Sequence, residues 1–319
     1  MPRRVVLVGL GAVGMGYDLD LDPGLHALTH ASAISADPRF QLIAGVDVDR
    51  ERRAMFADRY GVPAFGSPEE VDGSSDVVVV ATPAGTHLEV AKRVAGCLDP
   101  RVLLLEKPMG ETLADARDIV ALATGADRDV RVNFHRAADP RIVEVAGLLA
   151  SGATARPYRG VGWYSKGLIN NASHLVALLL QWLGPPERVE LTASGRDGAH
   201  GPEPGFRLRF DGCDVDIHAV RHESYDRFAV ELVGDGGLIE LGGVPESILT
   251  RPVVDDPITP GYRVLGDPHP IGPTVDPRRT FAHVYDDVVR VLDGAPGHLP
   301  TAAQALDVQE ILNTVLTLR

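Results

Sequence analysis

Residues 5–14 have the sequence VVLVGLGAVG, and this stretch decides the fold. A short apolar run is followed at once by the spacing G-x-G-x-x-G, which is typical of a strand that turns tightly into a dinucleotide-binding loop. Glycines at these positions let a pyrophosphate approach the backbone N–H groups at the start of a helix. The spacing alone is weak evidence, because glycines also mark ordinary turns. Here it follows the first predicted strand, so we predict a cofactor loop formed by Gly9, Gly11, Ala12, Val13 and Gly14.

The remainder of the first 130 residues alternates apolar runs with helical patterns. Such continuous runs are typical of parallel strands buried on both faces of a sheet. They occupy residues 5–9, 42–47, 77–81, 102–106 and 130–134, and helical patterns occupy 50–60, 86–95 and 112–123. The alternation predicts a doubly wound parallel sheet of the Rossmann type. We therefore assign residues 1–130 to a dinucleotide-binding domain.

Residues 131–319 have a different pattern, with several strands in succession. This pattern predicts an α+β domain with an open, mostly antiparallel sheet, which we assign to substrate binding and oligomerisation. Its expected helices are 140–150, 173–183, 278–293 and 301–318, and a C-terminal helix can pack back on the first domain. Its expected strands are 158–164, 187–194, 205–210, 213–220, 227–233 and 238–242. Residues 251–275 are rich in Pro, Gly and Asp and are expected to form a loop.

One hairpin in this half has a register that the sequence specifies. Asp211-Gly212 separates two alternating segments, FRLRF and CDVDIHAV, and is a strong two-residue turn signal. The turn sets Phe210 opposite Cys213, so Arg209 faces Asp214 and Arg207 faces Asp216. The charged pairs then share one face of the sheet and the apolar residues share the other.

Composition narrows the class of protein. The chain has 319 residues and a formal net charge of -13, which argues against a nucleic-acid or anionic-membrane partner because both require a basic surface. No apolar run approaches the ~20 residues that span a bilayer. Two cysteines cannot form a disulfide framework, so a cytoplasmic location is expected. A small molecule is the expected partner.

Asp47 ends the second predicted strand, 33 residues after Gly14. A carboxylate at this position can accept hydrogen bonds from the adenosine ribose and repel a 2′-phosphate. No arginine occupies position 48, so NAD is favoured over NADP. The alternative is a turn residue at the end of the strand.

The spacing from Gly14 to Asp47 exceeds the usual ~20 residues, and the segment 17–29, YDLDLDPGLHALT, accounts for the excess. His26 and His30 stand at i, i+4, a spacing that can hold a metal on a helix. No ligand set completes such a site, so we predict no metal and favour a lid over the cofactor.

Lysine usage draws attention to one residue. The chain has 31 lysines and arginines, of which only Lys92, Lys107 and Lys166 are lysines. A lysine that persists in such a chain is a candidate for a role that arginine cannot fill. Lys107 directly follows the fourth predicted strand, and ligands of such sheets bind at the carboxyl ends of strands. A surface lysine is the alternative.

The order of motifs resembles the Gfo/Idh/MocA family, the group of glucose-fructose oxidoreductase and inositol dehydrogenase. The resemblance covers nearly the whole chain. It rests on GLGAVG (9–14), ATPAGTH (81–87), EKP (106–108), NNASH (170–174) and GDGGLIEL (234–241). It implies that Lys107 contacts the reacting hydroxyl and the nicotinamide ribose. It also implies that the cofactor is lined by Thr82, Pro83 and His87, with Glu106 nearby.

The resemblance places His174 as the histidine of the family's Asp-x-Gly-x-His segment. Here the aspartate is Asn170, the glycine is Ala172, and Ala177 stands where the family often has an aspartate. Hydride transfer from an alcohol requires a base for the hydroxyl proton. Lys107 can act as this base if its pKa is lowered. His174 needs a smaller shift, because the ordinary pKa of histidine is already close to neutral pH. Asn170 can orient a hydroxyl but cannot carry a proton. For His174 the alternative is a helix-start residue satisfied by the backbone.

Other polar residues are candidates for binding the substrate. Asn133, His135 and Arg136 follow the last strand of the first domain at its carboxyl end. Tyr164 can donate to a sugar hydroxyl, and Lys166 can meet a phosphate or carboxylate. Each of these last two residues can equally have a structural role.

These observations favour an NAD-dependent oxidoreductase, a dehydrogenase or a ketoreductase, acting on a sugar, sugar nucleotide or cyclitol. The alternative is a non-catalytic NAD-binding sensor or regulator of the same fold. The replacement of the family's aspartates by Asn170 and Ala177 favours this alternative. A hydrolase or lyase that uses NAD transiently is a third class. The family resemblance also implies a homodimer or homotetramer, because open sheets in such proteins pack face to face.

Overall fold

The computed structural model describes residues 1–125, 128–152, 156–243 and 247–319, and the chain forms two compact units. The first unit comprises Met1–Asp139 and Val275–Leu306, and the second comprises Pro140–Thr274 and Asp307–Arg319. The boundary predicted at residue 130 falls inside a strand of the first unit. The first unit therefore extends further along the chain than the sequence predicts, and it also takes a returning segment.

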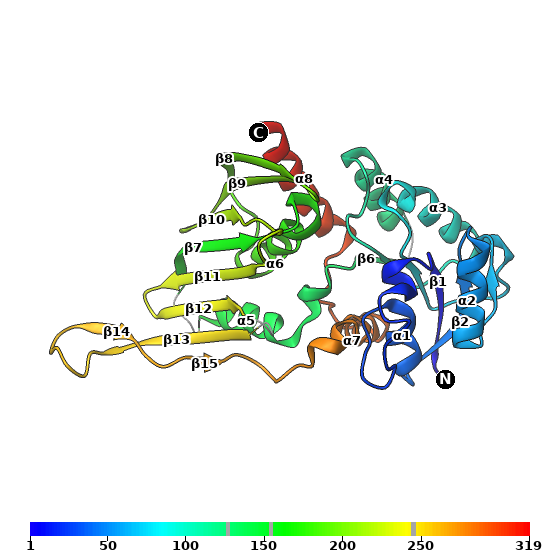
Figure 1. Cartoon of the computed structure of the whole chain (residues 1–319), viewed down its shortest axis with the longest axis horizontal. Coiled ribbons are helices and arrows are strands. Elements are labelled where there is room, and N and C mark those ends of the chain that lie inside the picture. The colour runs from blue at the N-terminus through cyan, green and yellow to red at the C-terminus, as the bar shows by residue number, and fades with distance from the viewer. Residues whose placement is uncertain (126–127, 153–155, 244–246) are drawn as a thin grey trace. The chain divides into compact units, whose positions relative to one another are not determined.

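The first unit contains a six-stranded parallel sheet in the order β3-β2-β1-β4-β5-β6. This is the doubly wound order, and it confirms the predicted Rossmann domain. The sheet's strands β1, β2 and β6 are labelled in Figure 1. All five predicted strands are present, and β3 was not predicted. The strands are β1 (Arg3–Val8), β2 (Phe40–Val46), β3 (Ala64–Phe65), β4 (Val77–Val80), β5 (Val102–Leu105) and β6 (Asp129–Val132).

Helices cover both faces of this sheet. Right-handed crossovers place α1 and α2 on one face, and α3 and α4 on the other. The returning helix α7 packs beside α1, and its apolar residues join the core built on β1, β4 and β5. The bounds are α1 (His30–Ala36), α2 (Arg50–Tyr60), α3 (His87–Cys97), α4 (Leu113–Thr124) and α7 (Thr280–Leu292).

A helix was expected to begin directly after the glycine loop, but the connection there is different. Residues Ala12–Gly16 form a single π-helical turn, and α1 begins only at His30. Thr29 caps α1 in a reciprocal capping box with Ser32. The segment 17–29 therefore delays the first helix and supplies its cap.

The second unit contains one large mixed sheet in the order β14-β13-β12-β11-β7-β10-β9-β8, with β15 beside β13. Most neighbouring strands are antiparallel, as predicted, and among the described residues of this sheet only β10 and β7 run parallel. The predicted strands are β7 (Pro157–Tyr164), β8 (Arg188–Gly198), β9 (Gly201–Phe210), β10 (Cys213–Ala219), β11 (Phe228–Gly234) and β12 (Gly237–Gly242).

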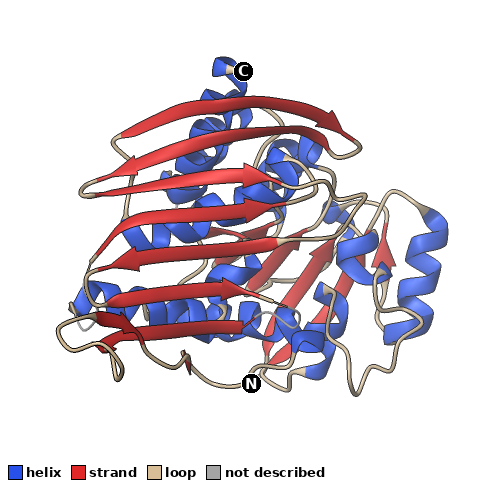
Figure 2. Cartoon of the chain, turned by 60° about the vertical axis from the view of Figure 1, so that its left-hand side comes forward, coloured by secondary structure: helices blue, strands red, loops and turns tan. Residues whose placement is uncertain are grey.

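The helices of the second unit lie behind the sheet in Figure 2, and they leave its other face uncovered. They are α5 (Pro140–Ser151), α6 (Ser173–Leu183) and the greater part of α8 (Ala302–Leu318). Helix α6 is almost entirely buried because its residues are apolar on every side.

The Asp211-Gly212 hairpin has the predicted register. Cys213 pairs with Phe210, and Arg207 faces Asp216 with the guanidinium donating at 2.8 Å. Arg209 binds both Asp214 and Glu190 of the next strand. The alternate residues of both strands are buried: Phe206, Leu208, Phe210, Cys213, Val215 and Ile217.

The prediction of a loop at 251–275 was wrong. Three strands form over this region: β13 (Ser247–Asp255), β14 (Arg263–Leu265) and β15 (His269–Pro270). Strand β13 pairs with β12 over six residues, and this long-range pairing overrides the local turn propensity of its Pro and Asp residues. Among the described residues, no helix has the length and apolar character needed to cross a membrane.

Candidate active site

The three glycines of the first loop have different surroundings. Gly9 has φ +98°, and a Cβ there would lie 2.5 Å from the backbone of Ala81. A Cβ on Gly14 would lie 2.1 Å from the carbonyl oxygen of Gly9. Gly11 is different, because the nearest atom to its Cβ would be Nη1 of Arg52 at 3.7 Å. Two glycines are thus required by packing, whereas Gly11 leaves open the space that a pyrophosphate needs. The loop fits a dinucleotide.

Asp47 follows β2 and holds this loop in place. Its Oδ2 accepts from the backbone N–H of Leu10 at 2.8 Å, and its Oδ1 accepts from that of Asp49 at 2.8 Å. The strand-end role and the proposed ribose contact are therefore compatible, since a carboxylate has further acceptor positions. Arg52 is not among the residues predicted from the sequence, and its Nη1 lies 3.8 Å from Asp47 Oδ2.

The ATPAGTH segment follows β4 at the same carboxyl edge. The Thr86 hydroxyl donates to the carbonyl of Pro83 at 2.7 Å and lies 2.9 Å from Thr82 Oγ1, and these bonds stiffen the turn. His87 is buried, and its ring bridges the carbonyls of Thr82 and Met109 at 2.8 and 3.1 Å. His87 thus ties this turn to the segment after EKP, while Pro83 is exposed.

Glu106 and Lys107 directly follow β5, beside the segment after β4 in the sheet. Lys107 is half-buried, and the peptide bond to Pro108 is cis. Burial lowers the pKa of Lys107, the Arg136 guanidinium lowers it as well, and the Glu106 carboxylate opposes both. The structure places an amine with a depressed pKa at the edge where the nicotinamide is expected.

Glu106 is surrounded by donors from three parts of the first unit. Its Oε1 lies 3.0 Å from Nε2 of His30 and accepts from Nδ2 of Asn133 at 2.6 Å. Its Oε2 accepts from the backbone N–H of Lys107 at 3.2 Å. Burial disfavours the carboxylate, but the hydrogen bonds from His30 and Asn133 outweigh it, so the pKa of Glu106 lies below its ordinary value.

The residues after β6 lie mostly inside the protein. Asn133 is buried and its Nδ2 donates to Glu106, so it supports this carboxylate, and the predicted substrate contact stays a prediction. His135 stacks on Phe281, with ring centroids 6.0 Å apart. Burial lowers the pKa of His135 to about 3, so its ring is neutral at physiological pH. Arg136 is half-buried.

The segment 17–30 does not gather a metal site. Asp18 binds Thr29, Ser32 and Leu28, and His26 Nδ1 lies 3.2 Å from the carbonyl of Asp22. His30 turns toward Glu106. Among the residues that the structure describes, no group of three or more His, Cys, Asp or Glu side chains could hold a metal ion.

The candidates of the second unit lie at the end of β7 and the start of α6. Tyr164 is fully buried, and its hydroxyl donates to the carbonyl of Pro204 at 2.7 Å. The structure therefore gives Tyr164 a packing role in place of the predicted sugar contact. Lys166 has a positive φ of 64°, and its Nζ lies 2.8 Å from Oδ2 of Asp226.

Asn170 lies in the π-helical turn Leu168–Ala172, and His174 is the second residue of α6. Ser173 donates to the carbonyl of Asn170 at 3.3 Å. His174 is buried among the apolar residues of the helix, and the neighbouring Ala177 is buried as well. The roles of Asn170 and His174 stay predictions.

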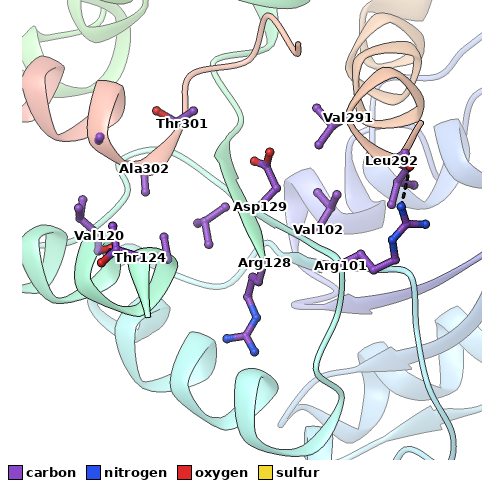
Figure 3. Close-up of a pocket in the computed structure, with 13 residues that line it drawn as sticks. Arg101, Val102, Val120, Thr124, Arg128, Asp129, Val291, Leu292, Thr301 and Ala302 are labelled. Carbon is purple, nitrogen blue, oxygen red and sulfur yellow. Dashed lines mark hydrogen bonds between the residues drawn. The ribbon is translucent and has the colours of Figure 1, made fainter. Parts of the chain in front are cut away.

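A cavity of about 570 Å³ lies at the opposite edge of the first sheet (Figure 3). It is lined by Val102 and Asp129, the first residues of β5 and β6, and thus by amino ends of strands. Arg101 donates to the carbonyl of Leu292 at 2.6 Å, and Arg128 is paired with Asp99. Both guanidinium groups that line the cavity therefore already have partners. The cavity lies at the amino ends of the strands and is separate from the candidate site.

Comparisons with known proteins match this arrangement. Residues 3–134 match the family model named GFO_IDH_MocA, described as an oxidoreductase family with an NAD-binding Rossmann fold. The chain is 30% identical to the uncharacterized oxidoreductase YfiI of Bacillus subtilis over 47% of this chain and 38% of that protein. It is 26% identical to inositol 2-dehydrogenase 1 of Saccharopolyspora erythraea over 79% of this chain and 77% of that protein.

The fold also matches solved structures over its full length. The WlbA dehydrogenase of Bordetella pertussis, solved with NADH and UDP-GlcNAcA, has a TM-score of 0.74 and 19% sequence identity. The match covers 99% of this chain and 95% of that chain. At this identity the likeness establishes the two-domain fold.

Proposed function

We propose that this chain is a member of the Gfo/Idh/MocA family of oxidoreductases and an NAD-dependent enzyme acting on CH–OH groups. The proposed reaction moves a hydride between the nicotinamide and a carbon of a polyhydroxylated substrate, a sugar, sugar nucleotide or cyclitol. The observation that carries this proposal is Lys107, an amine of lowered pKa at the carboxyl end of β5. The similarity to inositol 2-dehydrogenase 1 supports the substrate class.

The residues of the first unit fit such a reaction. When NAD is bound, its nicotinamide supplies the hydride chemistry. Gly11 leaves room for the pyrophosphate, and Asp47 stands where a ribose hydroxyl can donate to it. In the oxidation direction, the neutral Lys107 amine accepts the proton of the substrate hydroxyl, and in reduction its ammonium returns it. His135 stays neutral and adds no charge beside this amine.

The second unit supplies the remaining proposed groups. We propose that His174 assists proton transfer and that Asn170 orients a substrate hydroxyl, as the family resemblance implies. Lys166 is kept as a candidate for an anionic substrate group, although Asp226 already binds its ammonium. Because Asn170 and Ala177 replace aspartates of the family pattern, a non-catalytic NAD sensor is the second candidate function.

The proposal is tested by incubating the protein with NAD and a panel of cyclitols, sugars, sugar acids and sugar nucleotides. An enzyme produces reduced nicotinamide, measured by its absorbance, with at least one compound. A sensor binds NAD, and its thermal stability increases with a panel compound, yet it produces no reduced nicotinamide.

We expect the protein to bind NAD more tightly than NADP, because the Asp47 carboxylate repels a 2′-phosphate. Asp47→Asn should lower the ratio of the NAD affinity to the NADP affinity by about tenfold, because it removes one negative charge close to the 2′-phosphate. Fluorescence titration of both cofactors measures the ratio. Damage to the loop lowers both affinities together, so only the ratio is informative. Equal affinities in the unmodified protein would show that Arg52, and not Asp47, dominates this end of the site.

We also propose a homodimer or homotetramer. The uncovered sheet face of the second unit supports this (Figure 2), and so does the ribbon formed by β13 and β14 (Figure 1). Five large apolar side chains are exposed on this ribbon: Val254, Ile258, Tyr262, Val264 and Leu265. Exposed apolar clusters mark interaction surfaces. Light scattering at micromolar concentration should give a multiple of 34.1 kDa, and a monomer contradicts the proposal.

A cytosolic location and a small-molecule partner complete the proposal. Cys97 and Cys213 are both free, which suits a reducing compartment. The net charge of -13 opposes binding to nucleic acid or to an anionic membrane.

A further inference from the structure

We propose that His30 is a positioning residue that holds Glu106 ionised beside Lys107, and that the segment 17–30 exists to place it. The proposal deepens the proposed function, because it concerns the charge next to the proposed base. From the sequence, His30 was a candidate only for binding a metal, and the present role is a different one.

The geometry gives His30 a partner on each ring nitrogen. The residue is fully buried, with Nε2 3.0 Å from Glu106 Oε1 and Nδ1 2.8 Å from the hydroxyl oxygen of Tyr285. Burial raises the pKa of Tyr285 well above its ordinary value, so this hydroxyl keeps its proton and can donate to Nδ1. Nε2 is then the nitrogen that carries hydrogen and donates to the Glu106 carboxylate. Tyr285 thus fixes the tautomer that Glu106 requires.

The segment 17–30 fixes the position of the ring. Asp18 is buried, and its carboxylate accepts from Thr29 Oγ1 at 2.7 Å, Ser32 Oγ at 2.5 Å and the backbone N–H of Leu28 at 2.8 Å. These bonds lock the cap of α1, and His30 is the first residue of that helix. The His30 ring also packs edge-on against Phe281, with centroids 4.8 Å apart. The cap fixes the backbone at His30, and the ring cannot turn away from Glu106 without losing its bond to Tyr285 and its contact with Phe281.

The consequence for Lys107 follows from electrostatics. The ionised Glu106 raises the pKa of Lys107, while burial and Arg136 lower it. Of the other groups around this pair, His135 is neutral, Asn133 and Tyr285 are uncharged donors, and Asp139 acts on His135. Without the bond from His30, burial favours protonation of Glu106, and the pKa of Lys107 then falls further. His30 thus sets the pH range in which the amine is a base.

The test measures Lys107 directly and needs no substrate. Trace acetylation with acetic anhydride at a series of pH values, followed by mass spectrometry, gives the titration midpoint of each lysine. The chain has only three lysines, so Lys92 and Lys166 serve as internal references. The variants are His30→Leu, which removes both bonds; His30→Gln, which keeps a donor toward Glu106; and Tyr285→Phe, which frees the tautomer. His26→Ala, in the same segment, is the matched control.

We expect His30→Leu to shift the Lys107 midpoint to lower pH while Lys92 and Lys166 stay unchanged. Tyr285→Phe should shift it in the same direction by less, and His30→Gln and His26→Ala should restore or keep the original midpoint. With an active substrate in hand, the rising limb of the kcat–pH profile for the oxidation should move to lower pH in His30→Leu, in step with the Lys107 midpoint.

An unchanged Lys107 midpoint in folded His30→Leu and Tyr285→Phe proteins would overturn the proposal. Equal shifts in His30→Leu and His30→Gln would also overturn it, since they would indicate packing and not the donor. If no substrate is ever found, the labelling result still stands, so failure of the proposed activity and failure of this inference are distinguishable.

Discussion

Replacing Lys107 with alanine should lower kcat by about 10²- to 10⁴-fold, the contribution of a positioned acid or base, while NAD affinity changes by less than about tenfold. Lys107→Arg should be as inactive, because a guanidinium cannot release its proton in this pH range. Lys92→Ala, on the exposed side of α3, is the matched control and should keep full activity. His174→Ala should also reduce turnover. Unchanged rates in both Lys107→Ala and His174→Ala would place the reaction elsewhere.

The pH dependence of kcat is a second test of Lys107 as the base. In the oxidation direction the amine must be neutral, so kcat rises with pH through the pKa of Lys107. That pKa lies below the ordinary value of 10.5, because burial disfavours the ammonium. The rising limb should therefore lie at lower pH than for an exposed lysine, and it should disappear in Lys107→Ala.

Gly11→Val should lower the affinity for NAD by about 100-fold, equivalent to about 2.7 kcal/mol, without unfolding the protein. The backbone of Gly11 has φ −80°, which a valine tolerates, and its Cβ would meet no atom closer than 3.7 Å. The added side chain occupies the approach of the pyrophosphate. Calorimetric titration with NAD measures the loss.

Two further glycine variants act as controls for this prediction. Gly14→Ala places a Cβ 2.1 Å from the carbonyl oxygen of Gly9, so it should destabilise the fold by about 1–3 kcal/mol, the usual cost of overpacking. Gly96→Ala lies at an open position on α3, so it should not destabilise the fold and should leave NAD binding unchanged. Normal NAD affinity in Gly11→Val would show that the cofactor does not use this loop.

The first unit was predictable because its strands are buried on both faces and appear as continuous apolar runs. Strands β4 and β5, VVVV and VLLL, illustrate this, and each is fully buried. The hairpin register was predictable for a related reason, since a slip by one residue would expose Phe206 and Leu208. In both cases local sequence and tertiary burial favour the same structure.

The remainder depends on contacts between distant residues. Strand β13 forms in a segment of turn-prone composition because β12 offers it a ladder of hydrogen bonds. The returning helix α7 brings Tyr285 to His30, 255 residues earlier in the chain. A contact between residues this far apart leaves no periodic pattern in the sequence, so it could not be predicted. Asn133 and Tyr164 were correctly seen as polar residues at strand ends, but their burial and their partners required the structure.

The most direct test of the account is NAD reduction by the purified protein across the panel of polyhydroxylated compounds, with Lys107→Ala measured in parallel. The account predicts that at least one compound yields reduced nicotinamide with the unmodified protein. It also predicts that Lys107→Ala, although it still binds NAD, yields almost none at the same pH. Tight NAD binding without reduction by any compound, or equal reduction by Lys107→Ala, would contradict it.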